Sequence, residues 1–136
     1  MSHGLPTVRM YMDSNSHALS ASDDILVALR RLISDGVTDA PVLDNNGRVV
    51  GMLSEYDCMN MLAKGRDGDM PRGLVREFMA SDFTAVPSTM DVYYVAGLFL
   101  NDRSRRRFVV VDGEKLVGVI TRKDILRAII SRLKGN

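Results

Sequence analysis

The pattern of hydrophobic and polar positions predicts a short series of elements in the first half of this chain. Apolar residues recur at helical spacing from Ile25 to Ile33. Two apolar runs, Pro41 to Leu43 and Arg48 to Leu53, flank the strong turn signal Asp44-Asn45-Asn46-Gly47. These runs are expected to pair as a hairpin, and a second helix follows from Glu55 to Ala63.

The second half repeats this series. A helix with the same apolar spacing runs from Val92 to Leu100. A hairpin joins Phe108 to Val111 with Lys115 to Ile120 around Asp112-Gly113-Glu114, and a helix from Arg122 to Leu133 closes the half. Because the hairpin strands are almost wholly apolar, we expect both faces of each to be covered.

A short helical lead and a short strand precede the first helix of each half. The leads and strands are predicted at Pro6 to Met12, His17 to Ser20, Leu74 to Met79 and Thr84 to Val86. Ser22 is expected to cap the helix in the first half, with Ser88 or Thr89 in that role in the second. Gly36 is expected to end the first of these helices.

The repetition extends to individual residues. Val8-Arg9-Met10-Tyr11-Met12-Asp13-Ser14 returns 67 positions later as Val75-Arg76-Glu77-Phe78-Met79-Ala80-Ser81. Between such anchors the register slips by one, so Asp44 corresponds to Asp112. A repeat of this length makes the half-chain the unit of structure. We assign residues 8–65 to the first repeat, residues 66–73 to a polar linker with Gly and Pro, and residues 74–134 to the second repeat.

Composition and charge narrow the classes of function. The formal net charge is +1, so no overall field favours nucleic acid or a membrane surface. The single cysteine, Cys58, excludes an internal disulfide framework and fits a reducing cytoplasm. No apolar run approaches the length of about 18 residues that spans a bilayer, and the N-terminus lacks the features of a signal peptide. We therefore expect a soluble cytoplasmic protein.

Motifs for catalysis and metal binding are missing from the sequence. The two histidines, His3 and His17, lie in different contexts without a cysteine pair, so we expect no metal site. The sequence shows no nucleophile paired with a base, no phosphate-binding Gly-rich loop and no carboxylate motif for metal. These features predict a protein that is not an enzyme and requires no cofactor.

Each hairpin ends in the pattern Gly-h-h-(Ser/Thr)-x-x-Asp, where h is apolar. Gly51-Met52-Leu53-Ser54-Glu55-Tyr56-Asp57 and Gly118-Val119-Ile120-Thr121-Arg122-Lys123-Asp124 both carry it. In this motif and in its element order the chain resembles a tandem CBS-domain pair, or Bateman module, over about residues 8–134. The resemblance implies an α+β (α/β-like) fold of two repeats related by a pseudo-twofold axis. Each repeat is then a small three-stranded sheet packed with two principal helices.

The resemblance also implies a function. Proteins similar to this one are regulatory sensors that bind adenosyl ligands in the clefts between the two repeats and modulate a partner protein. AMP and ADP are the ligands that we favour here, while ATP and S-adenosylmethionine remain candidates because they share the adenosyl group. The sequence does not identify the regulated partner.

The chemistry of the repeated motif fits such a ligand. Thr121 stands where a strand becomes a helix, so its hydroxyl and the free N–H groups there suit a phosphate. Asp124 lies one turn further on the same face, and its carboxylate can accept hydrogen bonds from both ribose hydroxyls. Ser54 and Asp57 repeat this arrangement in the first half. The alternative is purely structural, with the hydroxyl as an N-cap and the acid in the first turn.

By resemblance, the purine slot comes from the first strand of the repeat and the start of its hairpin. The residues expected around the second ligand are Thr84, Ala85, Val86, Arg107, Phe108, Val109, Thr121, Arg122, Lys123 and Asp124. Those expected around the first are Leu19, Ser20, Asp39, Ala40, Pro41, Ser54 and Asp57.

Arg103-Ser104-Arg105-Arg106-Arg107 is the strongest local charge feature. Arg103, Arg105 and Arg106 are candidate phosphate contacts, whereas the first repeat has Gly36-Val37-Thr38-Asp39 in this stretch and no basic residue. The second half is thus expected to prefer a charged nucleotide. A solvated basic loop is the structural alternative, and nucleic-acid binding is disfavoured because no aromatic platform accompanies the arginines.

Apolar residues on the principal helices exceed what the core needs, so we expect a homodimer paired through these helices. The alternative function is a structural or dimerisation module without a physiological nucleotide ligand. The ribose-binding carboxylates Asp57 and Asp124 argue against that alternative.

Overall fold

The computed structural model describes residues 4–65 and 72–134, so most of the predicted linker, residues 66–71, lies outside the described residues. The chain forms two compact units. One unit is Ser16–Phe83, and the other joins Met1–Asn15 to Thr84–Asn136. The lead segment of the first repeat therefore packs with the second repeat, and the lead of the second packs with the first.

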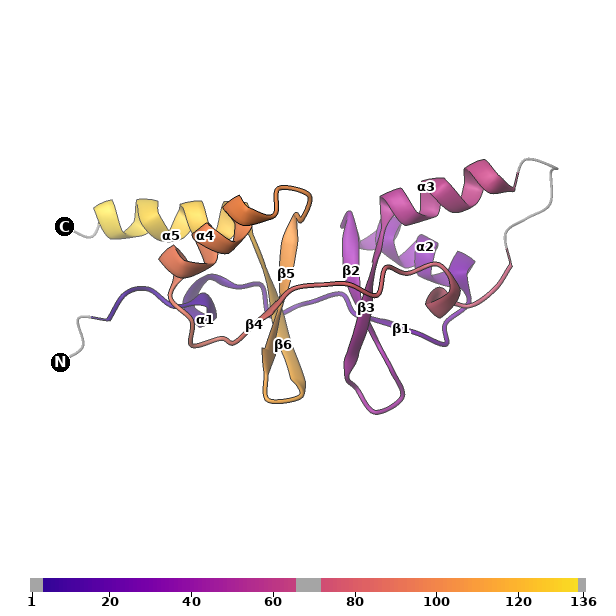
Figure 1. Ribbon diagram of the computed structural model, residues 1–136, viewed down its shortest axis with the longest axis horizontal. Helices are drawn as coiled ribbons and strands as arrows, with labels where there is room; N and C mark the ends of the chain where they lie inside the picture. Colours follow the sequence, from indigo (N-terminus) through magenta and orange to yellow (C-terminus); the bar gives the residue numbers. More distant parts are fainter. Residues whose placement is uncertain (1–3, 66–71, 135–136) are drawn as a thin grey trace. The chain divides into compact units, whose positions relative to one another are not determined.

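The unit Ser16–Phe83 is a three-stranded sheet with two principal helices on one side (Figure 1). Its elements are β1 (Leu19–Ser20), α2 (Ile25–Asp35), β2 (Asp39–Leu43), β3 (Val49–Ser54), α3 (Glu55–Lys64) and the 3-10 turn η1 (Val75–Glu77). The strand order is β1-β2-β3, with β1 parallel and β3 antiparallel to the central strand.

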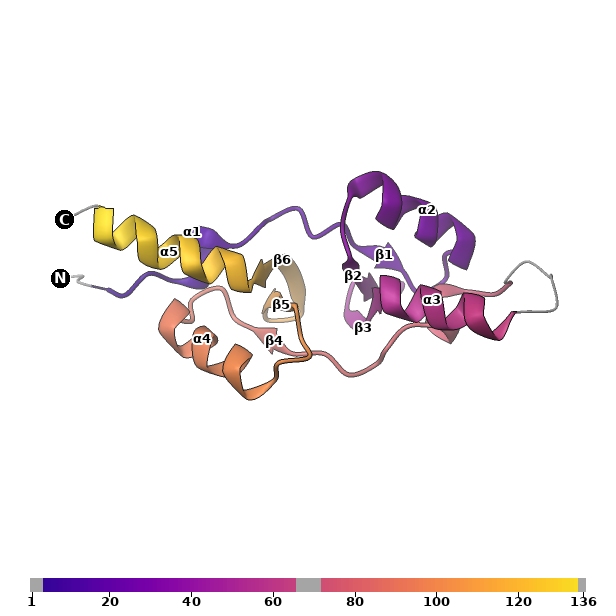
Figure 2. The same cartoon turned by 90° about the horizontal axis from the view of Figure 1, so that it is seen from above.

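The other unit repeats this topology (Figure 2). Its elements are α1 (Val8–Tyr11), β4 (Ala85–Val86), α4 (Val92–Asn101), β5 (Arg107–Asp112), β6 (Lys115–Thr121) and α5 (Arg122–Lys134). The strand order is β4-β5-β6, with the same parallel and antiparallel pairings. Two three-stranded sheets with helices confirm the predicted α+β fold. No helix of the described residues is long and apolar enough to cross a membrane.

Each unit has its own hydrophobic core between sheet and helices. In the unit Ser16–Phe83, the cluster is built from α2, α3, the sheet and the lead residue Val75. In the other unit, Phe99 of α4 stacks on Phe108 of β5, with ring centroids 3.9 Å apart and planes 7° from parallel. Val8 of the exchanged lead is fully buried in that cluster. The exchanged leads are therefore part of the cores, not appendages to them.

The residues that follow each lead pair with the outer strand of a hairpin through an isolated antiparallel bridge. The N–H and C=O of Ala80 bond to Met52 of β3 at 2.9 Å each, and those of Asp13 bond to Val119 of β6 at 2.9 and 3.0 Å. A Cβ on Gly51 would lie 2.5 Å from the Ala80 carbonyl oxygen, and one on Gly118 2.7 Å from that of Asp13. The glycine of the repeated motif is thus required by the close approach of a neighbouring backbone.

The N-caps differ from those predicted. Asp24, not Ser22, caps α2, because its carboxylate accepts from the N–H groups of Leu26 and Val27. Asp91, not Ser88 or Thr89, caps α4. In both cases the aspartate directly precedes the first helical residue, where its short side chain reaches the free N–H groups. The predicted end of α2 is confirmed, since Gly36 takes the left-handed conformation at φ 68°.

Candidate ligand-binding residues at two strand–helix junctions

The first junction, Ser54 to Asp57, is where β3 passes into α3. The Asp57 N–H donates to the Ser54 hydroxyl oxygen (3.1 Å), and the Ser54 N–H donates to Asp57 Oδ2 (2.9 Å). The Ser54 hydroxyl also donates to Oδ2, at 3.0 Å. This reciprocal arrangement is a capping box. Within residues 4–65 and 72–134, Asp57 Oδ1 has no hydrogen-bond partner, so one acceptor oxygen stays available.

The second junction, Thr121 to Asp124, is where β6 passes into α5. The Thr121 N–H donates to Asp124 Oδ2 (2.9 Å), and the Asp124 N–H donates to the Thr121 hydroxyl oxygen (3.3 Å). Here the other carboxylate oxygen is occupied, because Arg127 Nη2 donates to Asp124 Oδ1 at 2.5 Å. Asp124 is 7% exposed. The second carboxylate is therefore less accessible than the first.

Both junctions match the structural alternative set out above, since each hydroxyl and each acid takes part in helix capping. Capping does not exclude ligand binding at the first junction, because the box uses only one of the two carboxylate oxygens there. The sequence interpretation overlooked Arg127, although residues three apart on a helix face one another. The corresponding residue of the first repeat is Asn60, which is exposed.

Strand pairing gathers the other residues predicted near the second junction. Arg107 lies directly opposite Thr121 in the hairpin. On the other side of β5, the Val109 N–H donates to the Thr84 carbonyl oxygen at 3.0 Å, and Ala85 pairs with Val109. The start of β4, the start of β5 and the end of β6 therefore lie side by side at the same end of the sheet. Near the first junction, Asp39 likewise lies opposite Ser54.

Several apolar residues predicted to line a purine slot have their side chains in the cores instead. Val86 and Phe108 belong to one core, and Leu19 and Ala40 to the other. At these four positions only the backbone is free to line a ligand. Because side chains alternate along a strand, their neighbours Val109 and Pro41 point to the opposite sheet face, and both are buried. Ser20, next to Leu19 in β1, is partly exposed, and its hydroxyl contacts that of Ser22.

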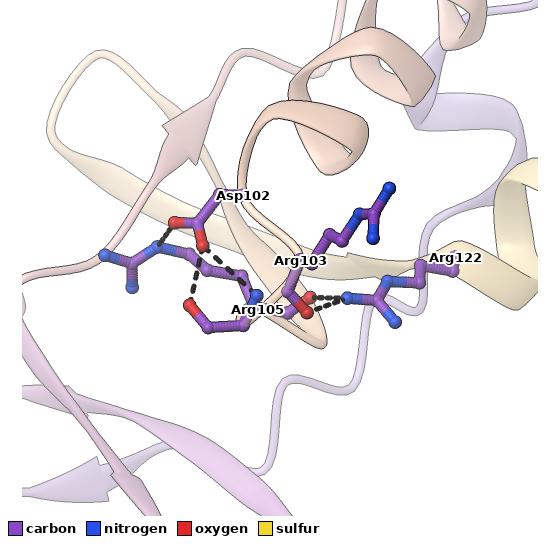
Figure 3. Close-up of polar contacts among 5 residues, drawn as sticks. Asp102, Arg103, Arg105 and Arg122 are labelled. Atoms are coloured by element: carbon purple, nitrogen blue, oxygen red, sulfur yellow. Dashed lines mark hydrogen bonds and ion pairs between the residues drawn. The ribbon is translucent and has the colours of Figure 1, made fainter.

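The arginine-rich loop between α4 and β5 is ordered by polar contacts (Figure 3). Arg122 Nη2 donates to the carbonyl oxygens of Arg103 (2.5 Å) and Arg105 (2.7 Å), and its guanidinium lies 6.0 Å from the Phe99 ring centroid. Arg105 Nε donates to Asp102 Oδ2 at 2.8 Å. The hydrogen bond from the Ser104 hydroxyl, assisted by Arg105, holds the pKa of Asp102 below its usual value. Arg122 thus fastens the loop to the start of α5.

The remaining basic side chains predicted to meet a phosphate differ in availability. Arg103 is exposed, and no dashed line reaches its guanidinium in Figure 3; Lys123 is exposed as well. In the part of the chain that the structure describes, neither side chain makes a hydrogen bond or ion pair. Arg106 is exposed and Arg107 is partly exposed. Arg103 and Lys123 are therefore the basic side chains of this region that are most accessible to an anion.

Comparison with known families agrees with the repeated topology. The model of the CBS domain matches residues 8–64 and again residues 75–131. The chain belongs to the CBS-domain family. Each match runs from the lead of a repeat to its closing helix, so the resemblance drawn from the two motifs is confirmed. Pairs of CBS domains are in general regulatory rather than catalytic modules.

Solved and curated relatives are CBS proteins of several kinds. CBSX2 in complex with AMP is 29% identical, with a TM-score of 0.78, over 94% of this chain and 98% of that one. CBSX2 from Arabidopsis thaliana in a second structure is 28% identical, with a TM-score of 0.79, over 98% and 99%. The 5'-AMP-activated protein kinase subunit gamma of Saccharomyces cerevisiae is 26% identical over 85% of this chain and 38% of its own. The chain spans 28% to 52% of the first curated relatives that it matches.

One polar cluster of the second CBS repeat was not anticipated. Ser88 is fully buried, and its hydroxyl and N–H donate to the two carboxylate oxygens of Asp112, at 2.6 and 2.9 Å. Arg9 of the exchanged lead donates to the Ser88 hydroxyl oxygen at 3.1 Å. The two hydrogen bonds from Ser88, helped by the charge of Arg9 beside the carboxylate, hold the pKa of Asp112 below its usual value. The corresponding residue of the first CBS repeat is Ala21, so this cluster belongs to the second alone.

Two further features concern the thiol of Cys58 and the side chains that could bind a metal. Cys58 is buried, and burial, together with the charges of Asp57 and Glu55, raises the pKa of its thiol. Residues 4–65 and 72–134 contain no cluster of three His, Cys, Asp or Glu side chains that could hold a metal ion.

Proposed function

We propose that this CBS pair is a regulatory module that binds an adenosyl nucleotide, with AMP or ADP as the ligand and without catalysis. The proposal is supported by the AMP complex of CBSX2, which is 29% identical along nearly its whole length. It is supported further by the match to a subunit of a kinase named for its activation by AMP. ATP and S-adenosylmethionine carry the same adenosyl group, so they are compared with AMP in the test below.

The uncommitted Oδ1 of Asp57 is the observation that carries this proposal. A ribose presents two neighbouring hydroxyl groups, and a carboxylate is an acceptor without protons of its own. The capping box fixes the orientation of Asp57 through Oδ2. Oδ1 is therefore held in a defined position while its lone pairs remain unused. A preorganised acceptor of this kind binds with less loss of side-chain freedom than a mobile one.

Charge distinguishes the two repeats as binding partners for phosphate. Beside the second junction, Arg103 and Lys123 are exposed cations, whereas the corresponding stretch of the first repeat, residues 36–39, carries no basic side chain. We infer that phosphate groups contribute more to binding in the second repeat and that the nucleoside contributes more in the first. Regulation of a partner protein then requires the ligand to bind one conformation better than another.

The test is calorimetric titration with AMP, ADP, ATP, S-adenosylmethionine and GMP. It is made on the wild type and on the variants Asp57→Asn and Asp124→Asn. Asparagine keeps one oxygen for the capping box and replaces the other by an NH2 group, which cannot accept from a ribose hydroxyl. Glu55→Gln removes a neighbouring charge from the same helical turn and serves as the matched control.

We expect adenosyl ligands to bind and GMP to bind more weakly. Asp57→Asn should weaken binding at the first junction at least tenfold, on the order of one charge-assisted hydrogen bond. Glu55→Gln should leave affinity within about twofold, since a surface charge of this kind contributes little. Absence of binding by every adenosyl ligand to the wild type would contradict the proposal.

A second candidate is a dimerisation module, favoured by apolar side chains that the units leave exposed on their helices. On α3, Tyr56 is 79% exposed and Met59 64%. On the other unit, Leu100 of α4 is 75% exposed and Leu133 of α5 68%. We propose a homodimer paired through these helices. Sedimentation equilibrium should give a dimer that Leu100→Glu weakens, whereas a monomeric wild type would contradict it.

A further inference from the structure

We propose that Arg127 is an internal competitor of the ribose hydroxyls at the second junction, so that a ligand there must displace it, while the first junction stands open. This inference rests on the proposed nucleotide binding and adds the residue that makes the two halves unequal. The supporting observation is the direct contact of Arg127 Nη2 with Asp124 Oδ1, at 2.5 Å.

Both oxygens of the Asp124 carboxylate already accept a hydrogen bond, one of them from a charged guanidinium. Oδ2 is held by the Thr121 N–H and Oδ1 by the Arg127 guanidinium. Its side chain is 10% exposed, whereas that of Arg127 is 59% exposed. The competitor is therefore the more solvent-exposed member of the pair. An incoming hydroxyl group would compete with this guanidinium for an oxygen of a side chain that is itself nearly buried.

The first junction lacks such a competitor. Asp57 makes the same backbone contact through Oδ2, at 2.9 Å, and no described residue bonds to its Oδ1. Asn60 is the residue that corresponds to Arg127. An asparagine side chain is too short and has no charge to reproduce a guanidinium contact with the preceding turn. The sequence difference between Asn60 and Arg127 is thus sufficient to account for the structural difference.

Arg127 also links the carboxylate to the exchanged lead segment. The same Nη2 atom donates to the carbonyl oxygen of Tyr11, the last residue of α1, at 3.4 Å. A ligand that draws Arg127 away from Asp124 would also alter its bond to Tyr11. Occupancy of the second junction is therefore coupled to how firmly the lead segment is held. The two states differ in contacts that the ligand changes, which is what population shift requires.

The experiment is a reciprocal exchange of the two residues, with AMP as the probe. Asp57→Asn weakens binding at the first junction, so that binding at the second can be measured by itself. Adding Arg127→Asn to this variant removes the competitor from the second junction. Asp124→Asn weakens binding at the second junction, so that binding at the first can be measured by itself. Adding Asn60→Arg to this variant introduces a competitor at the first junction. Calorimetry gives the affinity of each, melting temperature reports folding, and hydrogen exchange of the Tyr11 to Asp13 amides reports the lead segment.

We expect Arg127→Asn to tighten AMP binding at the second junction about tenfold, on the order of one charge-assisted hydrogen bond. Asn60→Arg should have the opposite effect and weaken AMP binding at the first junction. AMP should speed exchange at the lead segment in the wild type. Loss of stability alone cannot produce a gain in affinity, so the gain separates competition from a structural role.

Two results would overturn the inference in distinguishable ways. If the wild type binds AMP but Arg127→Asn leaves the affinity of the second junction unchanged or weaker, Arg127 is not a competitor, and nucleotide binding itself stands. If no variant and no wild-type sample binds AMP or another adenosyl ligand, the proposed function fails together with the inference.

Discussion

The two strand–helix junctions of this CBS pair have the same backbone arrangement but differ in what their side chains offer. At both, an N–H of the last strand residue donates to a carboxylate one turn into the helix. At the first, the second carboxylate oxygen is uncommitted, whereas at the second it binds Arg127. A repeated motif therefore reproduces a capping geometry, while a residue outside the motif decides whether the acid is available.

The cores of the two units likewise combine the same backbone arrangement with different side chains at corresponding positions. Phe108 of β5 corresponds to Ala40 of β2, and Ala128 of α5 corresponds to Met61 of α3. All four are buried. A large residue on the strand is thus accompanied by a small one on the helix, and the reverse holds in the other unit. Because protein interiors are close-packed, a larger side chain at one position of a shared backbone arrangement must be offset by a smaller one nearby.

The largest effect should come from the glycines on which both junctions depend. Gly51→Ala places a methyl group 2.5 Å from the Ala80 carbonyl oxygen, and Gly118→Ala places one 2.7 Å from that of Asp13. Because backbone must move in both cases, we expect each to lower the free energy of unfolding by about 1–3 kcal/mol, with Gly51→Ala the larger loss. Urea unfolding measures both.

Gly97→Ala is the control for these glycine variants. Gly97 lies in α4, and nothing is within 4 Å of an added Cβ. We expect a gain of about 0.5–1 kcal/mol from the lower flexibility of alanine. Unchanged stability in both edge variants would show that the lead segments do not constrain these positions.

A smaller effect should separate the two capping hydroxyls. Ser54→Ala removes both a hydrogen-bond acceptor for Asp57 N–H and a donor to Asp57 Oδ2. Thr121→Ala removes one longer bond, and Asp124 remains held by Arg127. We expect a loss of about 1 kcal/mol for Ser54→Ala, which is typical of an N-cap, and less for Thr121→Ala. Ser54→Thr should be nearly neutral. Equal losses in chemical denaturation would mean that the junctions are equivalent.

The smallest effect is a pH dependence confined to the second repeat. The folded pKa of Asp112 lies below its unfolded value of about 3.9, chiefly because of Ser88. Its stabilising contribution is therefore present above about pH 4 and is lost as pH falls through the folded pKa. Ser88→Ala should lower the melting temperature at pH 7, and the difference from wild type should shrink toward pH 3.

Asp112→Asn removes the titrating group and provides the control for that measurement. In its background, the effect of Ser88→Ala should no longer change between pH 7 and pH 3. A Ser88→Ala difference that stayed constant with pH in the wild-type background would show that the hydroxyl contributes by packing alone.

The sequence predicted the element order well because apolar periodicity and turn signals are local properties. The hairpin around Asp44 and the end of α2 at Gly36 followed from such signals, and the structure confirms both. The N-caps were misassigned because Ser22 and Asp24 are close in sequence and both can accept from free N–H groups. Only the backbone path selects Asp24, whose carboxylate reaches Leu26 and Val27.

The motif located the candidate acids, but their availability depends on contacts that the motif does not contain. Arg127 was within reach of a helical-spacing argument, since it is three residues from Asp124. Its bond to Tyr11 was not, because that partner is 116 positions away and belongs to the other repeat. The placement of Phe108 in a core followed from its stacking on Phe99, which also depends on tertiary structure.

The exchange of lead segments sets an order in which the protein can be completed during synthesis. The unit Ser16–Phe83 is continuous in sequence, so all its strands exist once residue 83 has emerged from the ribosome. Residues 4–15 precede this unit in the chain, whereas β6 and α5, which they contact, follow it. Closing so long a loop costs entropy that grows only slowly with length. The lead of the first repeat therefore finds its final neighbours only after the second repeat has been made.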